Sequence, residues 1–164
     1  MIRLVVLGAG TAGTTLANRL ARRYADELAG GGVSITVVDQ DNQHVYQPGL
    51  LFLPFGEYAT DQIVKKRKKQ LLPHVTFVQQ GIERLDAERN AVHLADGTVL
   101  PYDACVIATG SRTMPEATEG MPGLGWDDKV FDWYTIDGAV ALRDRLQRFR
   151  RGRLVVQMTG MPIK

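Results

Sequence analysis

Six residues near the start of the chain have a glycine spacing that could hold a phosphate group: Gly8-Ala9-Gly10-Thr11-Ala12-Gly13. In this GxGxxG pattern the first glycine permits a tight turn, and the second lets a pyrophosphate approach the backbone. The third glycine lets a helix pack closely on a strand. The N-terminus of that helix adds N–H groups and partial positive charge. The pattern therefore predicts a turn that binds a dinucleotide.

An acidic residue, Asp39, stands where dinucleotide-binding domains place a carboxylate for the adenosine ribose. A carboxylate at this position would accept hydrogen bonds from the ribose hydroxyls and would repel a 2′-phosphate, which disfavours NADP. The alternative interpretation is a surface aspartate at the end of a strand.

The elements around these residues are predicted to follow a β-α-β order. Residues 2–7 are apolar and rich in β-branched side chains, which is typical of a buried parallel strand. Residues 12–28 place their apolar side chains on one helical face, and three glycines end this helix. Residues 33–39 predict a second strand, parallel to the first through a right-handed crossover.

The rest of the chain predicts shorter elements. Residues 43–58 are irregular and apolar, which indicates a loop packed on an apolar surface, and residues 61–71 predict a helix. The remaining expected elements are strands at 75–79, 82–86, 91–94, 98–100 and 103–108, a helix at 135–150, and a strand beginning at 153. Turn residues between 82 and 100 indicate an antiparallel meander. We expect an α/β fold with a Rossmann-like parallel sheet and this small meander.

The composition excludes several classes of protein. The 164 residues include 45% hydrophobic and 23% charged side chains, as in ordinary globular proteins, and the net charge of +2 does not suggest nucleic acid as a partner. The lone Cys105 excludes an internal disulfide framework. No apolar run is long enough to span a bilayer, and Gly8 interrupts the first one, so we expect no secretory signal and a cytoplasmic location.

A second motif specifies the kind of dinucleotide. The segment Tyr102–Gly110, YDACVIATG, is an apolar strand that ends in Ala-Thr-Gly and follows the meander. With the glycine turn, this order over residues 1–112 resembles the FAD-dependent pyridine nucleotide-disulfide oxidoreductase superfamily, whose second FAD motif is such a strand. The resemblance implies FAD as the cofactor. It implies that the ADP half of FAD is held by Gly8, Gly10, Thr11, Ala12, Gly13 and Asp39. It also implies that Thr109 and Gly110 lie near the remaining part of the cofactor.

The segment His44–Leu50 separates the branches of this superfamily. Disulfide reductases carry a redox cysteine pair here, and this sequence has none, which excludes that activity. The segment instead resembles the flavin-proximal loop of sulfide:quinone oxidoreductases. This resemblance implies that Gln47 and Pro48 lie near the flavin and that Ile82 lies near the adenine.

The end of the chain disfavours NADH as the electron donor. The turn Gln157–Lys164 has one glycine, and Pro162 lacks the N–H that a phosphate cradle uses. In lacking a glycine-rich NAD fingerprint at this turn, the sequence resembles sulfide:quinone oxidoreductases and flavocytochrome c sulfide dehydrogenases. That resemblance implies sulfide as donor, a membrane quinone as acceptor, and a redox cysteine beyond Lys164. It also implies peripheral contact of the full-length protein with the cytoplasmic membrane face. Residues 130–136 lack the cysteine that many sulfide:quinone oxidoreductases carry there.

We interpret residues 1–150 as an incomplete FAD-binding domain and residues 151–164 as the first strand of a second dinucleotide-binding-like domain. On this interpretation the chain is the N-terminal part of a longer enzyme, contains no visible catalytic residue, and by itself is inactive and retains FAD weakly or not at all. The alternatives are a type II NADH:quinone reductase, a flavocytochrome c, and a nucleotide-binding module without turnover.

Other reactive side chains have simpler interpretations. Cys105 is expected to be a buried, unreactive core residue, and His74 and His93 have no companions at metal-ligand spacing, so no metal site is predicted. His44 could tune the flavin, but a structural role is favoured. The basic run 65–69 is interpreted as a solvated helix face, with anionic lipid as the alternative partner. The apolar run 50–55 could face a quinone or pack beneath the flavin loop.

Overall fold

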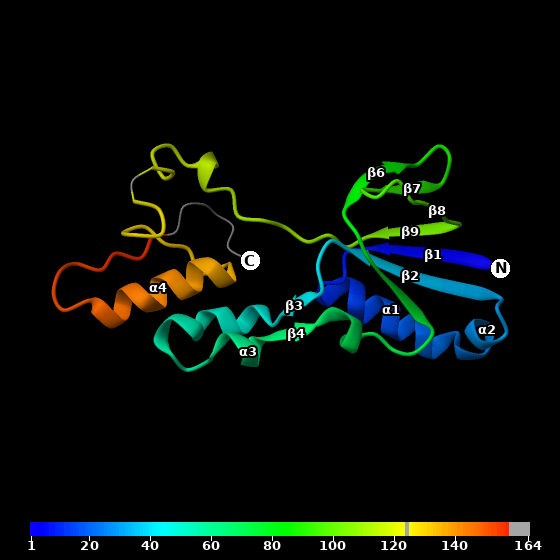
Figure 1. Cartoon of the computed structure of the whole chain (residues 1–164), viewed down its shortest axis with the longest axis horizontal. Helices are drawn as coiled ribbons and strands as arrows, with labels where there is room; N and C mark the ends of the chain where they lie inside the picture. The colour runs from blue at the N-terminus through cyan, green and yellow to red at the C-terminus, as the bar shows by residue number, and fades with distance from the viewer. Residues whose placement is uncertain (124, 158–164) are drawn as a thin grey trace. The chain divides into compact units, whose positions relative to one another are not determined.

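The computed structural model describes residues 1–123 and 125–157, and the chain divides into two compact units (Figure 1). Unit 1 comprises Met1–Val45 and Val64–Ser111. Unit 2 comprises Tyr46–Ile63 and the described residues from Arg112 onward. Each unit is therefore built from two segments of the chain.

A four-stranded parallel sheet forms the centre of unit 1. Its strands are β1 (Ile2–Leu7), β2 (Val33–Asp39), β5 (Val75–Gln79) and β9 (Ala104–Ile107), in the order β5-β2-β1-β9. The chain builds the sheet outward from β1 to β2 and β5, and then returns to the other side of β1 as β9. The order of strands thus reverses at β1, which makes the neighbouring ends of β1 and β9 a topological switch point. The predicted parallel sheet is confirmed.

Both faces of this sheet are covered, as Figure 1 shows. Helix α1 (Thr11–Arg23) packs on one face, where Val6 and Val37 meet Ala17 and Ala21 in one apolar cluster. The predicted meander covers the other face as the antiparallel strands β6 (Ile82–Asp86), β7 (Ala91–Leu94) and β8 (Val99–Pro101). The cluster on that face contains Val5, Leu7, Val38, Val92, Leu94 and Tyr102. Because side chains alternate along a strand, neighbouring valines of β1 and β2 serve opposite clusters.

The first helix is shorter than predicted. It ends at Arg23, and a separate helix α2 (Ala25–Ala29) follows after Tyr24, whose φ of −112° and ψ of 36° are not helical. The apolar periodicity continues across this break, so periodicity alone could not locate it.

The predicted helix at residues 61–71 is wrong. This stretch contains helix α3 (Thr60–Ile63), strand β4 (Val64–Lys66) and the 3-10 helix η3 (Arg67–Gln70). Strand β4 pairs antiparallel with β3 (Gln43–Val45), with His44 opposite Lys65. Backbone pairing with a segment about twenty residues away overrides the helical propensity of the lysines, because propensity is a weak prior against long-range contacts.

Unit 2 contains helix α4 (Ile136–Arg148), which packs against the 3-10 helix η2 (Leu53–Phe55). The 3-10 helices η1 (Gln47–Leu51) and η4 (Pro115–Ala117) complete its elements together with α3. The apolar run 50–55 faces both ways, because Leu50 and Leu53 are buried whereas Leu51 and Phe55 are exposed. The predicted helix at 135–150 is confirmed with slightly shorter bounds.

Residues 153–157 form no strand, and residues 158–164 of the predicted final strand and turn lie outside the described residues. None of the helices in the described part of the chain combines the length and apolar character that a bilayer-spanning helix requires.

Candidate dinucleotide-binding site

The glycine turn joins β1 to α1 and fits tightly against the end of β9. Gly8 has a φ of +100°, and a Cβ atom added there would lie 2.7 Å from the carbonyl carbon of Ala108 and 2.9 Å from Cα of Thr109. A Cβ atom at Gly13 would meet the carbonyl group of Gly8. The packing of the protein itself therefore requires glycine at these two positions.

Gly10 differs from its two partners. Its φ of −73° is open to any residue, and apart from the adjoining backbone no heavy atom of the described residues lies within 4 Å of an added Cβ. The fold thus has no need of glycine here, and the open space beside the backbone fits a ligand that approaches closely. Helix α1 begins just beyond, without a side-chain cap, and Thr14 N donates to Gly10 O at 3.0 Å. The N–H groups in the first turn of α1 have no acceptor within the helix, so they are free to bind an anion.

Asp39 braces this turn. Its side chain is 13% exposed, and its Oδ2 atom accepts a hydrogen bond from Ala9 N at 2.7 Å. Within the described part of the chain, the Oδ1 atom accepts a single long contact of 3.5 Å from Asp41 N. Since a carboxylate oxygen can accept more than one hydrogen bond, Oδ1 keeps capacity for a hydroxyl group.

Arg67 lies in the same site, although its sequence context gave no sign of this. Its side chain is 14% exposed, and Nη1 lies 3.5 Å from Asp39 Oδ2 and donates to Ala9 O at 2.8 Å. Its Nε atom donates to Asp41 Oδ1 at 3.2 Å. The guanidinium group offsets part of the charge of Asp39, so repulsion of a 2′-phosphate is a weaker argument than the sequence suggested.

The structure brings several of the other predicted residues to the same end of the sheet. Thr109 lies against Gly8, and Gly110 follows it with a φ of +76°. Gln80 N donates to Asp39 O at 2.9 Å, and Ile82 begins β6 two residues further on, partly buried against an apolar cluster. These positions lie at or just beyond the carboxyl ends of the parallel strands, where open α/β sheets bind their ligands.

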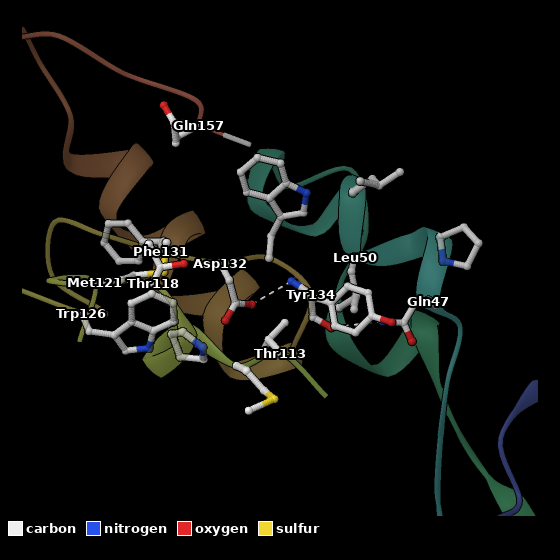
Figure 2. A pocket seen from close by; sticks show the side chains of 15 residues that line it. Gln47, Leu50, Thr113, Thr118, Met121, Trp126, Phe131, Asp132, Tyr134 and Gln157 are labelled. Carbon is white, nitrogen blue, oxygen red and sulfur yellow. Dashed lines mark hydrogen bonds between the residues drawn. The ribbon is translucent and has the colours of Figure 1, made fainter. Parts of the chain in front are cut away.

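Gln47 and Pro48 belong to unit 2, where they line a cavity of about 630 Å³ (Figure 2). Gln47 Nε2 donates to the carbonyl oxygen of Tyr134 at 3.2 Å. Most of the wall is apolar, and its large side chains are Leu50, Leu51, Met114, Met121, Trp126, Phe131, Trp133 and Tyr134. Aromatic and aliphatic walls of this kind suit a flat, uncharged ring.

Asp132 is the one charged side chain among the described residues that line this cavity. Its Oδ1 atom accepts hydrogen bonds from Tyr134 N at 2.8 Å and Thr135 N at 3.1 Å, the first of which is drawn in Figure 2. These hydrogen bonds tie the carboxylate to the backbone that forms the wall of the cavity.

The surroundings of His44 and Cys105 indicate structural roles for both side chains. His44 Nδ1 lies 3.4 Å from the carbonyl oxygen of Ala9, and His44 is absent from the wall of the unit 2 cavity. Cys105 is half-buried within β9, and burial raises the pKa of its thiol. A raised pKa lowers the thiolate fraction, which fits an unreactive core cysteine.

A parallel sheet with a GxGxxG turn at its switch point and an acid at the end of β2 define a Rossmann-like dinucleotide-binding unit. The sequence profile of the pyridine nucleotide-disulphide oxidoreductase family matches residues 2–157. The chain therefore belongs to this family of flavin-dependent oxidoreductases.

Individual relatives come from different branches of the family. The chain is 24% identical over 161 residues to the mitochondrial sulfide:quinone oxidoreductase of Mus musculus, covering 98% of this chain and 34% of that protein. It is 33% identical over 163 residues to an NADH dehydrogenase-like protein of Mycobacterium tuberculosis, covering 94% of this chain and 36% of that protein. The chain spans about a third of the length of these relatives.

Among solved structures, the fold is similar to sulfide:quinone oxidoreductase from Aquifex aeolicus, with a TM-score of 0.71 and 21% identity. The match covers 90% of this chain and 32% of that one. At this identity the similarity shows the fold, and the predicted Rossmann-like architecture is confirmed.

Proposed function

We propose that the protein to which this chain belongs is a FAD-dependent sulfide:quinone oxidoreductase. The observation that carries the proposal is the segment at Gln47 and Pro48, which resembles a flavin-proximal loop, contains no cysteine and lines an apolar cavity. Similarity to the mouse and Aquifex sulfide:quinone oxidoreductases supports the same assignment.

The residues of unit 1 fit the ADP half of FAD. The space beside Gly10 admits a pyrophosphate, and the first turn of α1 offers N–H groups to it. Asp39 Oδ1 is available to the adenosine ribose, while Thr109 and Gly110 contact the cofactor beyond the pyrophosphate and Ile82 contacts the adenine. Thr11, Ala12 and Gly13 contribute through their backbone.

In unit 2, we assign Gln47 and Pro48 to the flavin ring. Bound flavin supplies two-electron redox chemistry, and the protein supplies binding, orientation and exclusion of water. The apolar wall around Gln47 has the character that a ring of this size requires. We assign no catalytic side chain within the described residues and place the sulfur-accepting thiol in a later part of the protein.

The domain assignment made from the sequence stays part of this proposal. Residues 1–150 would belong to the FAD-binding domain, and residues 151–164 would begin a second dinucleotide-binding-like domain. Sulfide and a quinone would be the small-molecule partners, with peripheral contact of the full-length protein at the cytoplasmic face of a membrane.

A second function is favoured by one observation. The identity of 33% to a mycobacterial NADH dehydrogenase-like protein is higher than the 24% identity to the mouse sulfide:quinone oxidoreductase. An NADH:quinone reductase would use the same FAD site, so the geometry of unit 1 does not separate the two donors. The sequence of residues 157–164, with its one glycine and Pro162, supports sulfide over NADH.

The test is anaerobic bleaching of the flavin absorbance in the full-length protein, with sulfide added to one sample and NADH to another. Free FAD at the same concentration controls for uncatalysed reduction. Fast bleaching by sulfide alone supports the proposal. Bleaching by NADH alone contradicts it and assigns the protein to the NADH-dependent branch.

A further inference from the structure

One cation of the basic run faces the glycine turn while its neighbours face solvent. Lys66, Lys68 and Lys69 are exposed, whereas the side chain of Arg67 is 14% exposed. Arg67 N donates to Asn42 O at 3.1 Å, and Lys68 N donates to Asn42 Oδ1 at 3.0 Å. The backbone at Arg67 is therefore anchored to the loop after β2, which directs its side chain toward the site.

Several donors converge on the carbonyl oxygen of Ala9. Arg67 Nη1 donates to it at 2.8 Å and Thr14 Oγ1 at 3.0 Å, while His44 Nδ1 lies 3.4 Å away. In a planar trans peptide the C=O and the following N–H point in opposite directions. Holding the oxygen of Ala9 therefore sets the direction of the Gly10 N–H, which has no acceptor among the described residues.

The same guanidinium group also reaches the ribose-binding candidate. Arg67 Nη1 lies 3.5 Å from Asp39 Oδ2, the atom that accepts the hydrogen bond from Ala9 N. Arg67 thus contacts both partners of the hydrogen bond between Ala9 and Asp39. Its Nε atom also donates to Asp41.

We propose that Arg67 is a positioning residue of the dinucleotide site. Through Ala9 O it holds the Gly10 N–H toward the pyrophosphate, and through Oδ2 of Asp39 it holds the carboxylate so that Oδ1 meets the adenosine ribose. This inference rests on the proposed binding of FAD. Arginine suits the role because its rigid fork serves three oxygens at once, whereas the ammonium of lysine is a single compact charge.

The experiment compares the full-length protein with its Arg67→Met, Arg67→Lys and Lys68→Met variants. Lys68→Met is the matched control because it removes a neighbouring exposed cation. The dissociation constant of FAD is measured for each apoprotein from flavin fluorescence, and ADP is titrated as a competitor. We expect Arg67→Met to weaken FAD and ADP by about tenfold or more, as for loss of a charged hydrogen-bond donor, and Arg67→Lys to weaken them less. Lys68→Met is expected to stay within about twofold, since an exposed ion contributes little.

Chemical rescue separates positioning from general structural support. Guanidinium ion at low millimolar concentration is expected to restore part of the FAD affinity of Arg67→Met and to leave the wild type unchanged. Equal affinities in the wild type and Arg67→Met would overturn the inference. If Arg67→Met does not fold, Arg67→Lys decides, because wild-type affinity there would also overturn it. A wild-type protein that binds neither FAD nor ADP would instead refute the proposed function, and the inference with it.

Discussion

Arg3 and Asp103 form a two-pronged ion pair that ties the start of β1 to the residue before β9. Nη2 of Arg3 donates to Oδ1 of Asp103 at 2.9 Å, and Nε donates to Oδ2 at 3.0 Å. Arg3 N also donates to Oδ2 at 2.7 Å. The contact joins the two strands whose opposite ends carry the glycine turn and the Thr109–Gly110 segment.

This pair predicts a loss of stability in acid. The hydrogen bonds from the Arg3 side chain and backbone lower the pKa of Asp103 from 3.8 to about 2. A carboxyl group whose pKa is lowered by folding contributes stability above its unfolded pKa and loses the contribution as the pH falls through the folded value. Asp103→Asn should therefore be less stable than the wild type at pH 7, and the difference should shrink from about pH 4 to about pH 2.

Thermal or urea unfolding at several pH values measures this effect. Glu83→Gln is the control, because Glu83 is an exposed carboxylate of β6 without an ion pair in the described part of the chain. A difference between Asp103→Asn and the wild type that stays constant down to pH 2 would contradict the prediction.

Substitutions at Gly13 and Gly10 should separate the contribution of the turn to stability from its contribution to FAD binding. A Cβ atom at Gly13 would meet the Gly8 carbonyl, so Gly13→Ala is expected to lower the free energy of unfolding by about 1–3 kcal/mol. Gly10→Ala has open space and an ordinary φ, so its melting temperature should match the wild type. Its FAD affinity should nevertheless fall by about tenfold, since the methyl group occupies the space assigned to the pyrophosphate. Wild-type FAD affinity in Gly10→Ala would move the ligand away from this turn.

The start of α4 offers a test in unit 2. Thr135 Oγ1 accepts a hydrogen bond from Gly138 N at 3.1 Å, which caps the helix. Thr135→Ala should cost about 1 kcal/mol of stability, and Thr135→Ser should recover most of it because the hydroxyl group remains. Urea denaturation of the three proteins measures the effect, and a midpoint of Thr135→Ala equal to that of the wild type would show that the cap contributes nothing.

Cys105 should behave as a core residue. Burial raises the pKa of its thiol, so the thiolate fraction at about pH 8 falls below that of a free cysteine. Reaction with a chromogenic disulfide reagent should be slow in the folded protein and fast after unfolding in urea. Cys105→Ala should keep the rate of flavin bleaching, and a large loss of that rate would give this thiol a part in the reaction.

The 164-residue chain expressed by itself is expected to retain FAD weakly or not at all, because it spans about a third of the length of the relatives that it matches. Absorbance near the flavin bands after purification measures the retained cofactor. Stoichiometric flavin would show that these residues suffice to hold it.

The central sheet could be predicted because its signals are local. Residues 2–7, 33–39 and 75–79 are short apolar runs bounded by turn residues, and each became a strand with the expected bounds. The meander followed from turn residues at 88–90 and 96–97, which separate the strands β6, β7 and β8. The glycine spacing located the turn at the end of β1 for the same reason.

Arg67 could not be found in this way. In the sequence it is the one arginine among five consecutive basic residues, but nothing local shows which of the five side chains turns inward. Its role depends on the pairing of β4 with β3 and on acceptors at Ala9, Asp39 and Asp41. The cavity of unit 2 could not be predicted for the same reason, because its walls come from residues 47–51, 113–134 and 157, which no short stretch of sequence contains together.

The interleaving of the two units constrains how the chain can be synthesised and folded. Residues 46–63 leave the ribosome before β5 to β9 exist, yet their packing partner α4 is made only after residue 135. The segment that carries the exposed Leu51 and Phe55 therefore lacks its packing partner while more than seventy further residues are translated. Neither unit can be excised as one continuous piece, and a gene truncation between residues 46 and 111 would remove residues of both units.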